Sequence, residues 1–211
     1  MGLVSVRPST GYPEIDSELF VNGEPLIIYG EPGSGKTNLV LKILRESLRI
    51  GMNASYISTE GSLVLERMDR MGILDFEALH IAFAQSLSHL AKLVSEAIIA
   101  ERSIVVIDSI NSLYRTEVGF TPRANEIFLG ILAMLKHHSL SGRWSIATAQ
   151  VREIEDLEPS GIDLISFYCK NLARVSKNAR GIRILEVRGK KYRFKITEDN
   201  VIFSTRVSTL R

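Results

Sequence analysis

GEPGSGKT at residues 30–37 matches the phosphate-loop pattern G-x-x-x-x-G-K-[ST]. The segment consists of Gly30, Glu31, Pro32, Gly33, Ser34, Gly35, Lys36 and Thr37, and Asn38 follows it. It lies between an apolar run at residues 26–29, which predicts a buried strand, and an apolar stripe of helical spacing at residues 39–48. The glycines let backbone N–H groups point at phosphate oxygens, and the helix N-terminus adds positive potential. We therefore predict that residues 30–38 bind ATP or a close relative.

Two side chains of this segment and one acid further along predict the chemistry of the site. Lys36 is placed to reach the β and γ phosphates, and the Thr37 hydroxyl is a ligand for Mg²⁺. Asp108 follows the apolar run at residues 104–107, at the carboxyl end of a predicted strand, where ligands bind in open α/β sheets. We expect Asp108 to hold the same Mg²⁺ through its water shell.

Hydrolysis also needs a group that orients or deprotonates water. Glu60 follows the predicted strand at residues 54–57, and Gln150 follows the one at residues 144–149. The carboxyl ends of parallel strands converge on one edge, so both side chains are candidates to reach the γ-phosphate. Spacing alone does not decide between this role and a solvated carboxylate or amide in a loop.

The order of the predicted elements indicates an α/β fold. Apolar strands at residues 79–84 and 104–107 alternate with helical stripes at residues 87–98 and 127–135, as in a parallel sheet covered on both faces. Alternating polar and apolar residues at 192–197, flanked by residues 182–187 and 201–203, predict antiparallel strands. With 211 residues, 45% of them apolar, we expect one domain with a core at about 9–170 and a β extension at about 171–211.

Positive charge is concentrated in the last part of the chain. Residues 170–211 hold 12 Lys and Arg against 3 Asp and Glu, whereas residues 1–169 hold 14 against 21. A basic segment on an acidic body suggests an anionic partner, either nucleic acid or a neighbouring subunit with its acidic face or bound nucleotide. A solvated strand face explains the charge equally well. The candidates for DNA binding are Lys190, Lys191, Arg193 and Lys195.

Several classes of protein do not fit this sequence. The apolar runs are short and broken by charges, which excludes a membrane span, and the first ten residues lack the apolar stretch of a signal peptide. Cys169 is the one cysteine, so no intrachain disulfide can form. We therefore expect a cytoplasmic protein that has no membrane partner.

Beyond the phosphate loop, five further segments resemble the RecA/RadA family of recombinase ATPases and their KaiC-like relatives. They are STGYPEID at residues 9–16, YISTEG at 56–61, VIDS at 106–109, ATAQV at 147–151 and FKITED at 194–199. The resemblance covers nearly the whole length and implies the RecA-type P-loop fold, with slow Mg²⁺-dependent ATP hydrolysis.

The resemblance also implies roles for individual residues. Glu60 becomes the carboxylate that activates water, and Gln150 becomes a sensor of the γ-phosphate. Arg67 aligns with a family arginine that stacks on adenine, whereas a surface charge on a helix is its alternative. Arg188 resembles a KaiC-type arginine that acts on the ATP of a neighbouring subunit, although Glu186 stands where a lysine often accompanies it.

Two departures from the recombinase pattern make the chain similar to the short RadB-type archaeal paralogues. Eight residues precede Ser9, so we expect neither the N-terminal DNA-binding domain nor the linker that joins recombinase subunits. The loop at residues 152–158 carries four acids and one base, whereas a loop that follows a phosphate backbone should be basic. If DNA binds, we expect it on the basic C-terminal face.

These observations predict an accessory ATPase of recombinational DNA repair that binds single-stranded DNA weakly. Its expected partners are a recombinase or another protein, and further copies of itself. The alternative is a KaiC-like regulatory ATPase that switches protein partners without binding DNA, which the acidic loop favours. A nucleotide-binding switch with negligible hydrolysis is a third interpretation.

Overall fold

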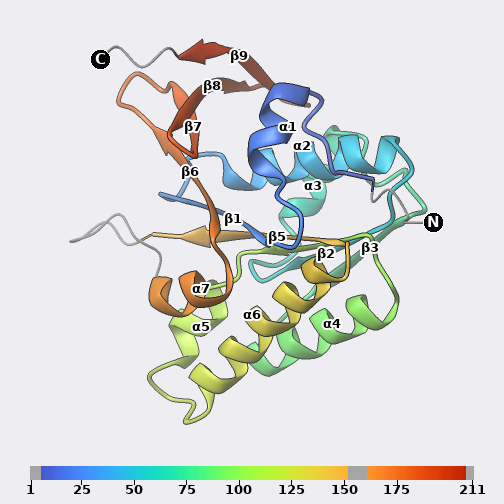
Figure 1. Ribbon diagram of the computed structural model, residues 1–211, viewed down its shortest axis with the longest axis vertical. Helices are drawn as coiled ribbons and strands as arrows, with labels where there is room; N and C mark the ends of the chain where they lie inside the picture. Colours follow the sequence, from blue (N-terminus) through green and yellow to red (C-terminus); the bar gives the residue numbers. More distant parts are fainter. Residues whose placement is uncertain (1–5, 152–160, 208–211) are drawn as a thin grey trace.

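The computed structural model describes residues 6–151 and 161–207, and its strands form one sheet (Figure 1). In spatial order the strands are β3 (Leu79–Phe83), β2 (Ala54–Ser58), β4 (Ile104–Asp108), β5 (Trp144–Gln150), β1 (Leu26–Gly30), β6 (Asn171–Lys177), β7 (Arg183–Val187), β8 (Lys190–Ile196) and β9 (Val201–Val207). The first six are parallel, and β7, β8 and β9 continue the sheet in antiparallel pairs. The predicted α/β fold is confirmed.

Helices cover both faces of the parallel strands (Figure 1). One face carries α1 (Pro13–Leu19), α2 (Lys36–Arg49) and α3 (Val64–Arg70). The other carries α4 (Leu87–Ile99), α5 (Ser112–Glu117), α6 (Ala124–Leu140) and α7 (Ile162–Tyr168). Within the described ranges, no helix is long and apolar enough to cross a membrane.

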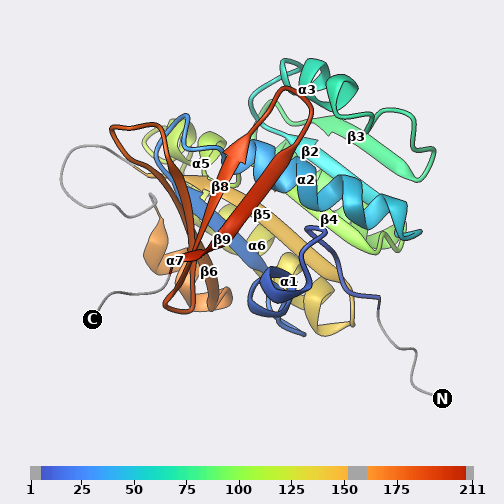
Figure 2. The same ribbon diagram turned by 90° about the horizontal axis from the view of Figure 1, so that it is seen from above.

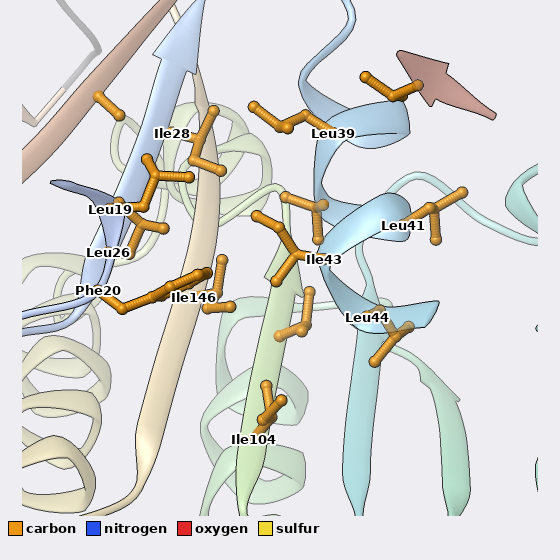
Figure 3. Close-up of a cluster of buried hydrophobic side chains, with 14 of the residues drawn as sticks. Leu19, Phe20, Leu26, Ile28, Leu39, Leu41, Ile43, Leu44, Ile104 and Ile146 are labelled. Atoms are coloured by element: carbon orange, nitrogen blue, oxygen red, sulfur yellow. The ribbon is translucent and has the colours of Figure 1, made fainter. Parts of the chain in front are cut away.

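The sheet separates two hydrophobic cores. Figure 3 shows the core under α2, where Ile43 lies among Ile28, Ile104 and Ile146. Neighbouring strand residues, such as Ile27 and Ile107, face the second core instead. Because alternate residues of these strands are buried on opposite faces of the sheet, their sequences are unbroken apolar runs. Full burial of a Leu or Ile side chain stabilises the folded state by roughly 1.5–3 kcal/mol. The buried side chains of α2 therefore hold this helix firmly against the sheet, next to the phosphate loop.

The antiparallel strands β7, β8 and β9 turn over α2 instead of extending the sheet away from it (Figures 1 and 2). The Arg45 guanidinium of α2 donates to the Asp199 carbonyl at 2.9 Å and to the Asn200 side chain at 2.6 Å, in the turn between β8 and β9. Tyr12 packs edge-on against Phe203 of β9, with ring centroids 5.2 Å apart. These contacts hold β9 and the turn before it against α2 and the segment that leads into α1.

Each strand predicted from apolar runs or alternation overlaps an observed one, and so does each predicted helix. The short helices α1, α3, α5 and α7 were not predicted, because six or seven residues are too few to display a helical period. Strand β6 was also missed. Its inward positions include Asn171, whose amide donates to the Leu19 carbonyl at 2.6 Å. The division of the chain at residue 171 stays a prediction.

Candidate functional site

The carboxyl ends of four parallel strands meet at one edge of the sheet. Ser58 of β2 pairs in register with Asp108 of β4, and Gly30 of β1 pairs with Gln150 of β5. Asp108 and Gln150 occupy two of these strand ends. Glu60 follows Ser58 in the sequence, and the phosphate loop follows Gly30. The register of the sheet, more than any single loop, therefore brings them together.

Two glycines let the phosphate loop pack against the C-terminal strands. A Cβ on Gly30 would lie 2.0 Å from the Val175 carbonyl oxygen of β6. Gly35 has a φ of +109°, and a Cβ there would lie 2.8 Å from Cδ1 of Ile196. At Gly30 the neighbour is a fixed backbone atom, so packing requires a glycine there, whereas at Gly35 the positive φ is the stronger reason for one.

Lys36 lies inside the curl of the loop. Its Nζ donates hydrogen bonds to the carbonyl oxygens of Gly30 and Glu31, each at 2.9 Å. Burial lowers the pKa of Lys36, while the nearby Asp108 and Glu60 carboxylates act in the opposite direction. The ammonium group is therefore held at the loop, among the groups that would meet a triphosphate.

Asp108 is buried at the end of β4 and is fixed by two hydroxyl groups. Tyr56 donates to its Oδ2 at 2.6 Å, and Thr148 donates to its Oδ1. Burial, together with the adjacent Asp108, raises the pKa of Tyr56 well above its usual value, so the phenol remains a donor. A carboxylate has about four lone-pair positions, and these two bonds leave capacity for a hydrated cation.

Glu60 and Gln150 are in direct contact. The Gln150 side-chain amide donates to Oε1 of Glu60, and Arg115 donates to the Gln150 side-chain carbonyl at 3.2 Å. The Asn111 side chain bonds the backbone of Gln150 in both directions, at 2.9 and 3.0 Å. The strand end that carries Gln150 is thus tied to the segment that follows Asp108. Sequence reasoning did not find Arg115 or Asn111, because neither belongs to a motif.

These groups surround a cavity of about 390 Å³. It is lined by Pro32, Gly33, Gly35, Lys36, Thr37, Asn38, Glu60, Arg67, Asp108, Ser109, Thr148, Gln150, Arg183 and Ile196. The predicted loop residues Gly30, Glu31 and Ser34 support the curl and do not line the cavity. Arg188 does not line it either, because it lies in the turn at the opposite end of β7 from Arg183.

Arg183 and Ile196 of the C-terminal extension also line this cavity, and sequence reasoning missed both. They lie on the inner face of the extension, level with Phe194, against Gly35 of the loop. The excess of basic residues after residue 170 was the available signal. It did not single out Arg183, which is one of 12 basic residues at positions 170–211.

The four predicted DNA-binding residues do not lie on one face. Lys191, Arg193 and Lys195 alternate with the buried Tyr192 and Phe194 and face outward. Lys190 lies on the inner side and forms an ion pair with Glu18 of α1, so it does not share the outer face with the other three candidates.

The remaining outer cations differ in their partners. Lys191 pairs with Glu186 at 3.5 Å, whereas Arg193 and Lys195 form no ion pair with any described residue. Both line a second cavity of about 480 Å³, which we call the basic groove. Its lining is Arg180, Gly181, Ile182, Arg183, Arg193, Phe194, Lys195, Ile196 and Ser204, with no carboxylate among them. The acidic loop at residues 152–158 lies outside the described residues.

The described part of the chain holds no cluster of three or more His, Cys, Asp or Glu side chains suited to a metal ion. Thr37 and Asp108 are oxygen ligands on the wall of the cavity beside the phosphate loop. Mg²⁺ is usually held by one or two protein oxygens together with substrate phosphates and water, so this sparse set fits that ion. The buried His138 and Cys169 lie elsewhere and contribute nothing to the cavity.

Comparison with known proteins adds a family to this geometry. Residues 26–164 match the family model of the ATPase family associated with various cellular activities (AAA). The DNA repair and recombination protein RadB of Methanosphaera stadtmanae is 30% identical over 173 residues, which cover 74% of this chain and 73% of the relative. RadB of Methanococcus maripaludis is 30% identical over 193 residues, covering 82% and 88%. RadB of Thermococcus onnurineus is 27% identical, covering 92% and 96%.

Proposed function

The chain belongs to the P-loop ATPases, as a RadB-like member of the RecA family, and from this premise we propose that it binds ATP with Mg²⁺ and hydrolyses it slowly. The observation that carries the proposal is the convergence of Lys36, Thr37, Glu60, Asp108 and Gln150 on one cavity. A general ATPase function follows from the family. The cation, the rate and the role of each residue are our proposals.

Lys36 would bind the β and γ phosphates and offset the charge that develops on them. Its present partners are two backbone carbonyls of the loop, and a phosphate oxygen is a stronger acceptor for an ammonium group. Thr37 and Asp108 would hold Mg²⁺, Asp108 through water. When bound, the cation neutralises negative charge on the phosphate oxygens.

Glu60 would position the attacking water and accept its proton. Its contact with the Gln150 amide supports this role, because the amide directs one carboxylate oxygen and leaves the second for water. Gln150 would respond to the γ-phosphate by exchanging this contact for one with phosphate. Its bonds to Asn111 and Arg115 then provide a route by which that exchange affects the neighbouring helix α5.

Two further arginines have proposed roles. Arg67 lines the cavity from α3 and would stack on the adenine ring, as a guanidinium plane does on aromatic faces. Arg188 is exposed in the turn between β7 and β8 and would act on the ATP of a neighbouring copy. A homo-oligomer is part of this proposal.

We propose that the chain has an accessory role in recombinational repair, in which it assists a recombinase or another protein partner. It would work in the cytoplasm and bind single-stranded DNA. Arg193 and Lys195 support DNA binding because they have no ion pair within the described residues and line the basic groove. Cations without an ion-pair partner are free to neutralise phosphates and to release the counterions condensed on the DNA.

One observation favours the alternative of a KaiC-like regulatory ATPase without DNA binding. Lys190 and Lys191, two of the four predicted DNA-binding residues, are engaged by Glu18 and Glu186 of the same chain. A face whose cations are partly neutralised internally attracts a polyanion less strongly.

ATP turnover separates these functions. We would measure it with Mg²⁺ or with a chelator, with and without single-stranded DNA, at low and moderate salt. Stimulation by DNA that fades with added salt supports the repair function. Turnover indifferent to DNA, with no retention of DNA on a gel, contradicts it and supports the regulatory ATPase. Lys36→Ala should abolish turnover, and Lys92→Ala, on the exposed surface of α4, should not change it.

A further inference from the structure

Arg183 is the cation of the C-terminal extension that lies closest to the phosphate loop. It begins β7, on the inner face, where its register partner on β8 is the buried Phe194. A Cβ built on Gly35 would lie 3.2 Å from its Cδ and 3.3 Å from its Nε. The side chain therefore packs directly on the residue that precedes Lys36.

The guanidinium of Arg183 is not satisfied within the described structure. Its Nε is buried without a hydrogen-bond partner, and the side chain forms no ion pair with a described residue. A buried donor without an acceptor costs free energy, and the cost is larger for a charged group. The position of the side chain is held by packing against Gly35 and not by a polar partner of its own.

Three other charged groups on the wall of the cavity already have hydrogen-bond partners, whereas Arg67 is exposed. Lys36 donates to two carbonyl oxygens, and Asp108 accepts from Tyr56 and Thr148. Glu60 accepts from the Gln150 amide. Arg183 differs from these three groups, because its buried Nε has no acceptor within the described residues. The fork of donors of an arginine fits two oxygens of a phosphate, which is the anionic group that a bound nucleotide brings into this cavity.

We propose that Arg183 donates to a phosphate oxygen of the nucleotide bound to its own subunit. The C-terminal extension then forms part of the ATP site and does not only carry basic charge on its surface. This inference rests on the proposed function, namely that ATP binds at residues 30–38. It has a structural consequence, because Arg183 also lines the basic groove. A bound nucleotide would therefore fix the Arg183 side chain, which is part of the wall of both the nucleotide cavity and the basic groove.

Lys177 provides a matched control. It is the register partner of Arg183 on β6, carries the same charge, is exposed, and lines neither of the two cavities. The experiment measures binding of ATP, ADP and adenosine to the intact chain and to the variants Arg183→Gln, Arg183→Lys and Lys177→Gln. Thermal unfolding of each variant is recorded in parallel.

We expect Arg183→Gln to weaken ATP and ADP roughly tenfold or more, as for the loss of one hydrogen bond to a charged group. Adenosine, which has no phosphate, should bind the variant as it binds the original chain. Arg183→Lys should recover part of the affinity for ATP, because the charge is kept and the fork of donors is lost. Lys177→Gln should bind all three ligands normally.

Unchanged ATP affinity in Arg183→Gln, with binding by the original chain intact, overturns this inference and leaves the proposed function standing. An equal loss for adenosine and ATP, accompanied by a lower unfolding temperature, assigns Arg183 a role in folding and also overturns it. If the original chain itself binds no ATP and resembles Lys36→Ala, the proposed function fails and takes this inference with it.

Discussion

The two parts of the sheet hold their charged groups in different ways. In the parallel part, formed by β1 to β6, buried charged groups at the carboxyl edge have partners before any ligand arrives, as Asp108 has in Tyr56 and Thr148. In the antiparallel extension, formed by β7 to β9, Arg193 and Lys195 form no ion pair with the described residues. Both parts present charge to ligands, but Arg193 and Lys195 of the extension lack fixed partners of the kind that Asp108 has.

This difference follows from where the groups lie. Buried charges at the end of a covered sheet must be hydrogen-bonded, since desolvation is otherwise too costly. Cations on the outer face of an exposed extension are hydrated and need no partner. The parallel part is therefore suited to one ligand in one geometry, whereas the extension is suited to a polyanion bound with little geometric demand.

The largest effect should come from Glu60 in the preorganised part. In Glu60→Gln, the shape and the neighbouring Gln150 remain, but the group can no longer accept a proton from water. We expect ATP turnover to fall a hundredfold or more, within the usual range for loss of a general base, while ATP affinity changes little. Phosphate release and nucleotide binding would be measured side by side.

Glu66→Gln is the control for this prediction, since Glu66 is an exposed carboxylate on α3 that does not line the cavity. It should leave turnover unchanged. If Glu60→Gln also hydrolyses ATP at the original rate, Glu60 is not the base. That result favours a nucleotide-binding switch with negligible hydrolysis of its own.

The second-largest expected effect is on DNA binding by the extension. It compares the loss of cations that have no ion pair within the described residues with the loss of cations that have one. The double variant Arg193→Gln/Lys195→Gln should lose roughly tenfold in affinity for single-stranded DNA. The slope of log affinity against log salt should fall by about 1.4, as for two phosphates. Lys190→Gln/Lys191→Gln removes the same charge from residues that are ion-paired with Glu18 and Glu186 and should lose less.

Fluorescence anisotropy with a labelled oligonucleotide at several salt concentrations would measure both double variants. Equal losses would show that only net charge matters and that the basic groove has no special part. No binding by the original chain would remove the repair function and support the regulatory ATPase.

The same contrast explains what could be predicted from the sequence. The phosphate loop and the apolar strand before Asp108 depend on local patterns, so their positions at the end of one sheet followed from the spacing. The contacts that fix these groups do not depend on local patterns. Tyr56 lies 52 positions before Asp108 in the sequence and looks like any apolar residue of a buried strand.

The extension was harder to predict in detail. Its alternation correctly indicated antiparallel strands and places Lys190 on the same side as Tyr192 and Phe194, but the ion-pair partner Glu18 is supplied by the distant helix α1. The presence of Arg183 in the nucleotide cavity depends on how the strands turn over α2. Such placements arise from tertiary packing between distant segments and leave no periodic signal in the chain.

A smaller effect tests whether preorganisation of Asp108 matters. Tyr56→Phe keeps the buried ring and removes the hydroxyl that donates to Asp108 at 2.6 Å. We expect unfolding to become easier by about 1–2 kcal/mol and turnover to fall several-fold, because the carboxylate is less firmly directed. Chemical denaturation and phosphate release would measure the two effects.

Tyr114→Phe is the matched control for that variant. Its hydroxyl donates to Asn125 at 2.8 Å, away from the cavity, so a modest loss of stability with unchanged turnover is expected. A similar fall in turnover for both variants would mean that the Tyr56 hydroxyl acts only through general stability.

The smallest effect tests the parallel part at its other edge, where His138 of α6 is buried. Its Nδ1 lies 2.9 Å from the Ser145 hydroxyl, and its Nε2 lies 2.8 Å from the Arg102 carbonyl. Burial is the main cause that lowers the pKa of His138, and the neighbouring Arg143 and His137 add to it. The folded chain therefore binds this proton less readily than the unfolded chain.

Stability from this lowered pKa is complete above about pH 6.5, the ordinary histidine value, and is lost as the pH falls below it, because the unfolded state gains the proton first. The loss between pH 6.5 and 5.5 is at most roughly 1.4 kcal/mol, or a few degrees in unfolding temperature. His138→Gln should remove this part of the pH dependence, whereas His80→Gln, at an exposed position, should retain it. If the stability of the original chain and that of His138→Gln depend on pH with the same slope, burial does not shift the pKa of this histidine. In that case the fixed partners of charged groups in the parallel part matter only at its nucleotide-binding edge.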